Sequence, residues 1–173
     1  MKKIALISAL VACFVASTAQ AADGTINFTG TITDQACTVD VNSATRTVPM
    51  GTISNTAFGT SAGVTAGAKT FDIVLQSCPE SVTSASVRFD GTTHAENSAI
   101  LALSSGQTAT HVGIALYEKD SATLIPVGTS SASVTLDSES SNTLSYIAKY
   151  MSTSTSVGAG SANSSAAFTI TYQ

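Results

Sequence analysis

The sequence predicts an all-β domain of the sandwich or barrel type, and three observations support this. Short runs rich in Thr, Val, Ile, Tyr and Phe alternate between apolar and polar residues, as half-buried strands do. Clusters of Gly, Ser, Asn and Asp separate these runs, as turns do. No segment shows sustained helical periodicity. Many short strands with such turns are typical of a β-sandwich.

The strand-like runs follow one another along the chain without a linker or an internal repeat, so a single domain is expected. They cover residues 45–53, 69–76, 85–89, 99–103, 111–117, 131–136, 142–151 and 166–172. Turn-prone clusters lie at residues 55–67, 90–91, 104–107 and 158–165. A disordered or mucin-like stalk is the alternative for a chain this rich in Ser and Thr. The period-two pattern and the presence of only three prolines argue against it.

The N-terminus has the parts of a secretory signal peptide. Lys2 and Lys3 precede an apolar stretch at residues 4–16, and small residues lead to a predicted cleavage after Ala21. A cut before Cys13, as in bacterial lipoproteins, is the alternative. It would leave an unusually short signal and an apolar start on the mature protein, so residues 1–21 are the favoured signal peptide.

The composition of the remaining 152 residues suits one domain with a real core. Removing Lys2 and Lys3 leaves five basic against 11 acidic residues. Nucleic-acid binding requires clustered Lys and Arg, so this balance argues against it. No later stretch approaches the roughly 20 apolar residues of a membrane helix. The mature product is therefore expected to be soluble or assembled at a surface.

Two cysteines, Cys37 and Cys78, remain after cleavage. An even number in an exported chain favours a disulfide over a metal site. Closing a loop of this length would stabilise the fold by about 4 kcal/mol in the chain-entropy model. Two free thiols in a reducing compartment are the alternative.

The start of the mature chain alternates cleanly. Ile26, Phe28, Gly30 and Ile32 share one face, and polar residues occupy the other. The apolar period then moves to odd positions from Cys37 onward. A one-residue slip sends every side chain to the opposite face, so residues 34–36 are expected to form a kink, bulge or sheet switch. Residues 22–33 are thus predicted to be an extension that behaves independently of a domain at 34–173.

The far end of the sequence is a second strand of unusual character. Phe168, Ile170 and Tyr172 alternate with polar residues up to the last position. A terminal strand this apolar needs a pairing partner, because termini are normally frayed. The partner could be a strand of its own sheet or a strand of another chain, and periodicity does not decide between them.

Taken together, these features resemble the type 1 and related fimbrial subunits of the chaperone–usher class. The features are an export signal, the alternating run 23–32, Ala36-Cys37-Thr38-Val39, Cys78, the penultimate Tyr172, and Gly160 fourteenth from the end. The resemblance covers the whole chain. It implies a structural subunit of a bacterial pilus (fimbria) that polymerises by donor-strand exchange, supports adhesion, and reaches the cell surface through the periplasm. A minor tip or adaptor subunit, or a receptor-binding one, is the alternative.

The resemblance also implies a fold and a site. The fold is a six-stranded, incomplete immunoglobulin-like β-sandwich, completed by a donor strand from another subunit. The donor residues would be Ile26, Phe28, Gly30 and Ile32. The acceptor groove, which also binds the periplasmic chaperone, would involve Gly160, Phe168, Ile170 and Tyr172. Partners would be identical or homologous pilins, the chaperone and the outer-membrane usher. Few residues precede Ile26, so the outermost pocket contact is expected to be weak or absent.

Residues with catalytic potential are sparse. His94 and His111 have no metal-binding or triad-like spacing. The carboxylate pairs Glu118/Asp120 and Asp137/Glu139 are interpreted as solvated surface charge. The sequence therefore predicts neither an enzyme nor a cofactor. A self-sufficient secreted sandwich with an unrelated enzymatic or inhibitory role is a further alternative.

Overall fold

The computed structural model describes residues 26–30 and 36–173 of the chain. The predicted signal peptide, Ile32 and most of the expected kink at 34–36 lie outside the described residues. The chain divides into two units, Met1–Ile32 and Thr33–Gln173. In the first unit the described residues form no helix or strand, and the side chains of Ile26 and Phe28 are 79% and 91% exposed.

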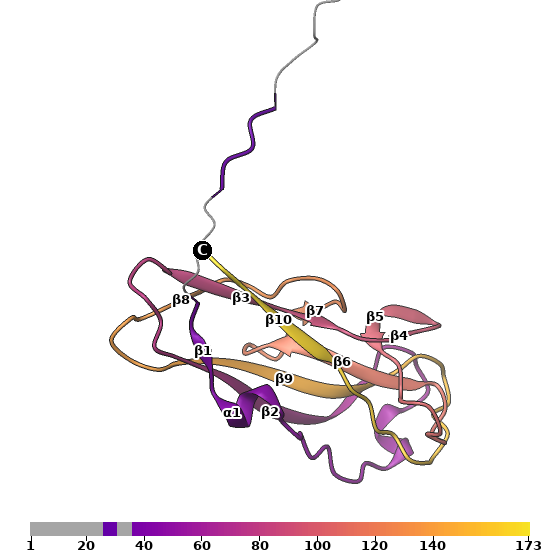
Figure 1. Ribbon diagram of the computed structural model, residues 1–173. Helices are drawn as coiled ribbons and strands as arrows, with labels where there is room; N and C mark the ends of the chain where they lie inside the picture. Colours follow the sequence, from indigo (N-terminus) through magenta and orange to yellow (C-terminus); the bar gives the residue numbers. More distant parts are fainter. Residues whose placement is uncertain (1–25, 31–35) are drawn as a thin grey trace, which may run out of the picture. The chain divides into compact units, whose positions relative to one another are not determined.

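The second unit is a sandwich of two antiparallel sheets (Figure 1). The larger sheet has the order β1 (Thr38–Val39), β2 (Thr65–Gln76), β9 (Asn142–Ser152), β6 (Val112–Glu118), β5 (Asn97–Leu101) and β4 (Thr93–His94), with β7 (Leu124–Ile125) paired to β6. The smaller sheet has the order β10 (Ala167–Tyr172), β3 (Ser84–Asp90) and β8 (Val134–Thr135). Two single-turn helices, α1 (Val41–Ala44) and η1 (Asn55–Phe58), lie in the connection between β1 and β2.

The main core lies between the two sheets, where alternate residues of β2, β3, β6 and β9 point inward. An aromatic cluster joins the layers. The Phe89 ring of β3 lies 5.1 Å from the Tyr146 ring of β9 and 5.9 Å from the Phe71 ring of β2, in edge-to-face geometry. The Tyr146 hydroxyl lies 3.2 Å from the Ser131 hydroxyl, so this buried polar group is satisfied.

Most of the predicted strands are present, and the all-β prediction is confirmed. Among the described residues six strands have five or more residues: β2, β3, β5, β6, β9 and β10. The prediction of a strand at 45–53 was wrong, although the residues alternate in character. The run predicted at 131–136 is a strand only at β8. The short strands β1, β4 and β7 were not predicted, because two-residue strands carry too little periodicity to be seen.

The strand prediction failed at 45–53 because a strand needs a hydrogen-bonded neighbour. Within the described part of the chain, no backbone–backbone hydrogen bond involves residues 46–53. The segment runs as an extended border of the sandwich after α1 and before η1. Among the described residues, no helix combines the length and the apolar character that crossing a membrane requires.

Candidate functional site: a groove beside the last strand

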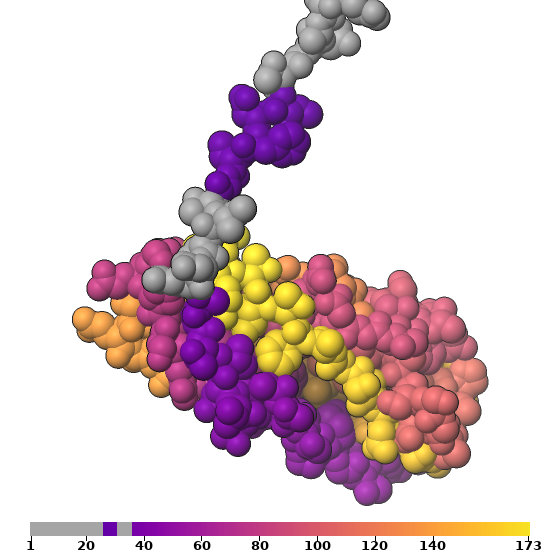
Figure 2. Space-filling model, in the orientation of Figure 1, coloured from indigo at the N-terminus to yellow at the C-terminus, as the bar shows by residue number. Residues whose placement is uncertain are grey.

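A groove runs between the first and the last parts of the sandwich. Its larger compartment has a volume of about 560 Å³. One wall is the segment from Ser43 to Gly51, and the other is the segment from Ala162 to Phe168. Figure 2 shows the recess between the indigo-to-violet N-terminal part of the domain and the yellow C-terminal part.

The floor of this larger compartment is the apolar interior of the sandwich. It is formed by Phe71 and Ile73 of β2, Phe89 of β3, Leu101 of β5, Ile114 and Leu116 of β6, Ala148 and Tyr150 of β9, and Phe168 of β10. Two members of the aromatic cluster, Phe71 and Phe89, are thus part of the core and of the groove at the same time. Such a lining suits apolar side chains rather than a charged ligand.

A smaller compartment of about 340 Å³ continues the groove beyond the start of β10. Its walls are residues 51–58 and residues 157–163. The two compartments meet at Gly51, Tyr150, Ala162 and Asn163, which line both. As one wall runs forward from Ser43 to Phe58, the other runs backward from Phe168 to Val157, so the two walls are antiparallel.

The backbone along the groove has hydrogen-bonding capacity that the described residues do not use. β10 pairs with β3 over residues 167–172 and forms the edge of its sheet on the other side. The opposite wall, residues 46–53, makes no backbone–backbone hydrogen bond among the described residues. Edge strands of this kind are templates for pairing with another chain.

The wall that precedes β10 is irregular but firmly held. The backbone N–H groups of Thr108 and Ala109 both donate to the Ser161 carbonyl oxygen, at 3.2 and 3.1 Å. The Tyr150 hydroxyl donates to the Ala162 carbonyl oxygen at 3.0 Å. Burial raises the pKa of Tyr150, so the hydroxyl keeps the proton that it donates. The groove therefore has a defined wall before the strand begins.

Gly160 is required by a close approach within this wall. A Cβ at this position would lie 2.4 Å from the Ala109 nitrogen and 2.4 Å from the Thr108 hydroxyl oxygen. Backbone atoms cannot move away as a flexible side chain can, so any side chain at 160 would push the wall off the 108–109 loop.

We expect Gly160→Ala to lower the free energy of unfolding by about 1–3 kcal/mol, the usual cost of overpacking. Urea denaturation followed by circular dichroism measures it. Gly106→Ala is not a suitable control because its φ is +82°, whereas Ala159→Ser changes the neighbouring position of the same wall. An unchanged midpoint for Gly160→Ala would show that this wall does not contribute to stability.

The structure separates the predicted acceptor residues. Phe168 lines the larger compartment and Gly160 lines the smaller one. Ile170 and Tyr172 lie on the same face of β10 as Phe168, half-buried against the main core, but line neither compartment. The predicted donor residues Ile26, Phe28 and Gly30 are exposed. Their docking into a groove remains a prediction.

Sequence reasoning missed most of the groove. The floor residues read as ordinary core positions, and nothing in the period-two pattern of β9 distinguishes Tyr150. The wall at 43–51 overlaps the alternating run 45–53, which the structure leaves without a strand partner among the described residues. Such a segment marks an edge that can accept a further strand.

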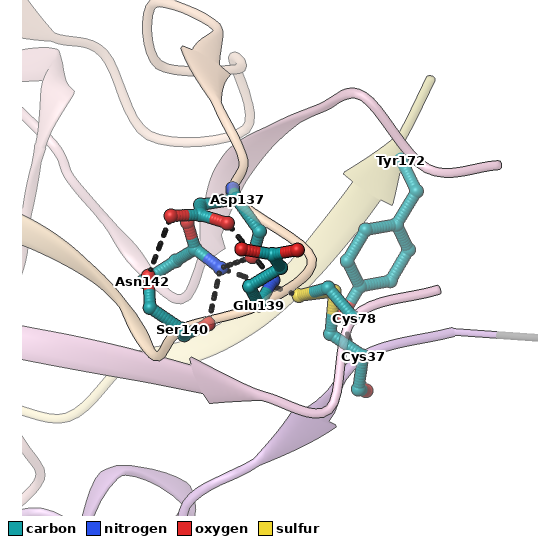
Figure 3. The surroundings of a disulfide bond; sticks show 7 residues. All are labelled: Cys37, Cys78, Asp137, Glu139, Ser140, Asn142 and Tyr172. Atoms are coloured by element: carbon teal, nitrogen blue, oxygen red, sulfur yellow. Dashed lines mark hydrogen bonds between the residues drawn. A yellow bond between two sulfur atoms is a disulfide. The ribbon is translucent and has the colours of Figure 1, made fainter. Parts of the chain in front are cut away.

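The disulfide between Cys37 and Cys78 lies at the end of the domain where β1 begins, next to the end of β10 (Figure 3). The Tyr172 hydroxyl donates to the Cys37 carbonyl oxygen at 3.5 Å. The bond spans 41 positions of sequence, and this loop contains the groove wall 43–51. The disulfide therefore ties Cys37, just before β1, to Cys78, just after β2.

A tight turn packs against the disulfide (Figure 3). The Asn142 amide donates to the Asp137 carbonyl oxygen at 2.8 Å and reaches the Cys78 sulfur at 3.6 Å. The Asp137 carboxylate accepts from the Glu139 backbone N–H and the Ser140 hydroxyl, and these bonds lower the pKa of Asp137. The Asp137 carboxylate therefore organises the turn itself.

The two histidines and the carboxylates of Glu96 and Asp120 have local partners. His111 Nδ1 lies 3.2 Å from the Glu96 carboxylate, and His94 Nδ1 accepts from the Glu96 backbone N–H. A hydrogen bond from the Thr153 hydroxyl and one from His111 lower the pKa of Glu96. The Asp120 carboxylate caps the turn before β7. Across the ranges 26–30 and 36–173, no group of three His, Cys, Asp or Glu side chains could hold a metal ion.

Comparison with known proteins shows which family the sequence resembles. The family model described as "Fimbrial protein" matches residues 26–173. The chain is 36% identical to a type-1 fimbrial protein subunit of Serratia marcescens, with all of both chains covered. It is also 36% identical to the fimbrial subunit type 1 of Salmonella typhimurium, with 92% of each chain covered.

Solved structures of fimbrial and pilus subunits are also similar to this chain. A Burkholderia pseudomallei antigen and type I fimbria protein is 40% identical, with a TM-score of 0.62, and 86% of this chain and 97% of that chain are covered. The P pilus rod subunit PapA shares the fold at 21% identity, with a TM-score of 0.63 over 79% of this chain and 99% of that one. The sandwich is thus the incomplete immunoglobulin-like fold of pilus subunits. This chain belongs to the fimbrial protein family and is a structural, non-enzymatic subunit of a cell-surface fimbria.

Proposed function

We propose that this subunit polymerises by donor-strand exchange, in which residues 22–33 of the next copy enter the groove of the copy before it. The observation that carries the proposal is the groove itself. Its apolar floor is bordered on one side by the free edge of β10 and on the other by residues 46–53, which make no backbone–backbone hydrogen bond among the described residues. An added strand would lie between β10 and residues 46–53. It would complete the sandwich through a ladder of main-chain hydrogen bonds.

The first unit of the chain has the complementary pattern. Ile26 and Phe28 are exposed large apolar side chains on one face of an alternating segment, followed on that face by Gly30 and Ile32. Full burial of each large side chain would contribute about 1.5–3 kcal/mol. Association of two copies would therefore remove from water both the exposed donor face and the apolar groove floor.

We further propose that a periplasmic chaperone covers the groove before assembly and that an outer-membrane usher receives the subunit. A groove whose larger compartment, of about 560 Å³, has an apolar floor beside a sheet edge is an aggregation hazard while the subunit is a monomer. A strand supplied by the chaperone would protect the same edge that the next subunit later occupies. We expect export to include cleavage after Ala21, and the intact mass of the mature protein measures it.

Deletion of residues 22–32 tests the proposal. The second unit, Thr33–Gln173, contains the complete groove, so the shortened subunit should still fold and still accept a strand. It should be unable to donate one. In a cell that expresses the matching chaperone and usher, we expect fibres to be absent with the shortened subunit alone. Electron microscopy of stained cells measures this.

A matched control replaces the outward-facing residues Asn27 and Thr29 by Ser, because these changes leave the apolar face intact. Fibres should form with the control variant. Normal fibres from the shortened subunit would contradict donor-strand exchange through this segment.

A further inference from the structure

We propose that Met50 is an oxidation site through which a peroxide controls whether this subunit can accept a strand. In an unfilled groove Met50 reacts and the groove then rejects a strand, whereas a filled groove protects Met50. This inference rests on the proposed donor-strand exchange and adds to it a means by which an oxidant stops fibre growth. It follows from the place of Met50 in the groove, the different environment of Met151, and the chemistry of a thioether.

Met50 belongs to the groove wall whose backbone is least restrained. It lines the larger compartment, and the residue is half-buried at the border of the main core. Among the described residues, no backbone–backbone hydrogen bond involves residues 46–53. The apolar floor, with Phe71 and Phe89 among its residues, lines the same compartment. A small oxidant that enters this compartment therefore has access to Met50.

Met151 is the other methionine of the mature chain, because Met1 belongs to the predicted signal peptide. It lies on β9, is 8% exposed, and packs with residues of β5 and β6 in a small second cluster. By strand alternation this cluster lies on the face of the larger sheet that points away from the main core. The Asn97 side-chain amide also reaches the Met151 sulfur at 3.8 Å. Since methionine oxidation follows exposure, Met50 reacts first and Met151 is an internal control.

The oxidation transfers one oxygen atom from hydrogen peroxide to the thioether. The sulfur attacks one peroxide oxygen, so that a sulfur–oxygen bond forms and the oxygen–oxygen bond breaks. The sulfur is oxidised, the peroxide is reduced, and the second oxygen leaves as water with both protons. The product is methionine sulfoxide, in which a polar group replaces a flexible apolar one.

A sulfoxide at position 50 conflicts with an incoming apolar strand. In the single chain the sulfoxide oxygen can accept hydrogen bonds from water, because the residue is only half-buried. A strand that fills the groove removes this water and takes the free N–H groups of residues 46–53 into its own ladder. The sulfoxide oxygen then lies unpaired against an apolar face, which is unfavourable. The oxidised groove therefore binds a strand more weakly than the reduced one.

The same geometry protects subunits that are already assembled. A strand in the groove covers Met50 and keeps the peroxide from its sulfur. Subunits within a fibre are then resistant, whereas a subunit that no strand covers is sensitive. A peroxide thus stops further assembly without breaking the fibre that already exists.

The test uses the mature subunit with Phe28→Asp, which keeps the groove but is not expected to donate its own segment. A synthetic peptide of residues 22–34 supplies the strand, and hydrogen peroxide is the oxidant. Mass spectrometry of proteolytic fragments follows the gain of oxygen at each methionine over time. Met50 should react at least about tenfold faster than Met151 in the folded subunit, because exposure governs the rate. Saturating peptide should slow the reaction of Met50 at least about tenfold and leave that of Met151 unchanged.

Strand binding is measured by fluorescence anisotropy of the labelled peptide. After oxidation of Met50 the dissociation constant should rise at least about tenfold, and methionine sulfoxide reductase should restore it. Met50→Leu keeps an apolar side chain of similar size, so this variant should bind the peptide equally well before and after peroxide treatment. Met151→Leu is the matched control and should remain sensitive to peroxide.

Equal reaction rates of the two methionines in the folded subunit would overturn the inference, as would unchanged peptide binding after complete oxidation of Met50. If donor-strand exchange itself is wrong, the unoxidised subunit and Met50→Leu both fail to bind the peptide, and control by oxidation is overturned with it. If only the role of Met50 is wrong, both bind the peptide and peroxide does not weaken the binding.

Discussion

A subunit that carries Phe168→Asp is expected to lose the ability to accept a donor strand while it keeps the ability to give one. Phe168 lines the larger compartment from β10, and its ring is half-buried against the main core. A carboxylate at this position would have to lose its water when an apolar strand covers the groove, and a buried unpaired charge is strongly unfavourable. No fibre should form from this variant alone.

Mixing two variants distinguishes a subunit that can no longer accept a donor strand from one that is misfolded. Phe28→Asp removes an apolar donor residue but leaves the groove of that chain intact. When refolded Phe168→Asp and Phe28→Asp subunits are mixed without the chaperone, which is proposed to use the same groove, the first should donate to the second, and growth should then stop. The expected product is a one-to-one dimer, measured by size-exclusion chromatography with light scattering. Phe168→Leu keeps an apolar lining and should still form fibres; fibres from Phe168→Asp alone would contradict the assignment of this groove.

Loss of the Cys37–Cys78 disulfide is expected to lower the free energy of unfolding by about 4 kcal/mol. The chain-entropy model predicts this for a loop closed over 41 positions, because the crosslink restricts the unfolded chain. The same loop contains the groove wall 43–51, whose backbone has few other restraints. Urea denaturation of the double Cys→Ala variant and of the oxidised natural protein measures the difference.

A matched control for the disulfide prediction is Asn142→Ala. This change removes the amide that reaches Cys78 and the hydrogen bonds to the neighbouring turn but leaves the crosslink. Its cost should be smaller, about 1–3 kcal/mol for a buried hydrogen-bonding group. A double Cys→Ala variant that is as stable as the oxidised protein would show that the loop is restrained without the bond.

The strands that the sequence predicted best are those whose alternating pattern places one face against the core. β3, β6, β9 and β10 were expected within one residue of their observed bounds. Residues 45–53 show what alternation of apolar and polar residues does not predict. Alternation reports that one face is apolar, but a strand also needs a hydrogen-bonded partner, which local sequence does not reveal.

The candidate site was predictable only in part. Phe168 and Gly160 line the two compartments, whereas Ile170 and Tyr172 line neither and, like Phe168, are half-buried against the core. That all four belong to the acceptor groove stays a prediction. Tyr150 could not have been chosen from the sequence. It is one inward residue among many on β9, and its position between the compartments depends on residues about 100 positions earlier and 12 positions later.

By itself, the sequence determined that the chain is all-β, that its first and last segments alternate, and that Cys37 and Cys78 are suited to a disulfide. These are properties of local pattern and composition. Only the tertiary structure decided that the two walls face each other across an apolar floor and that Tyr150 divides it. The reason is physical: a groove is made by residues brought together from distant parts of the chain, and period and phase contain no information about which segments meet.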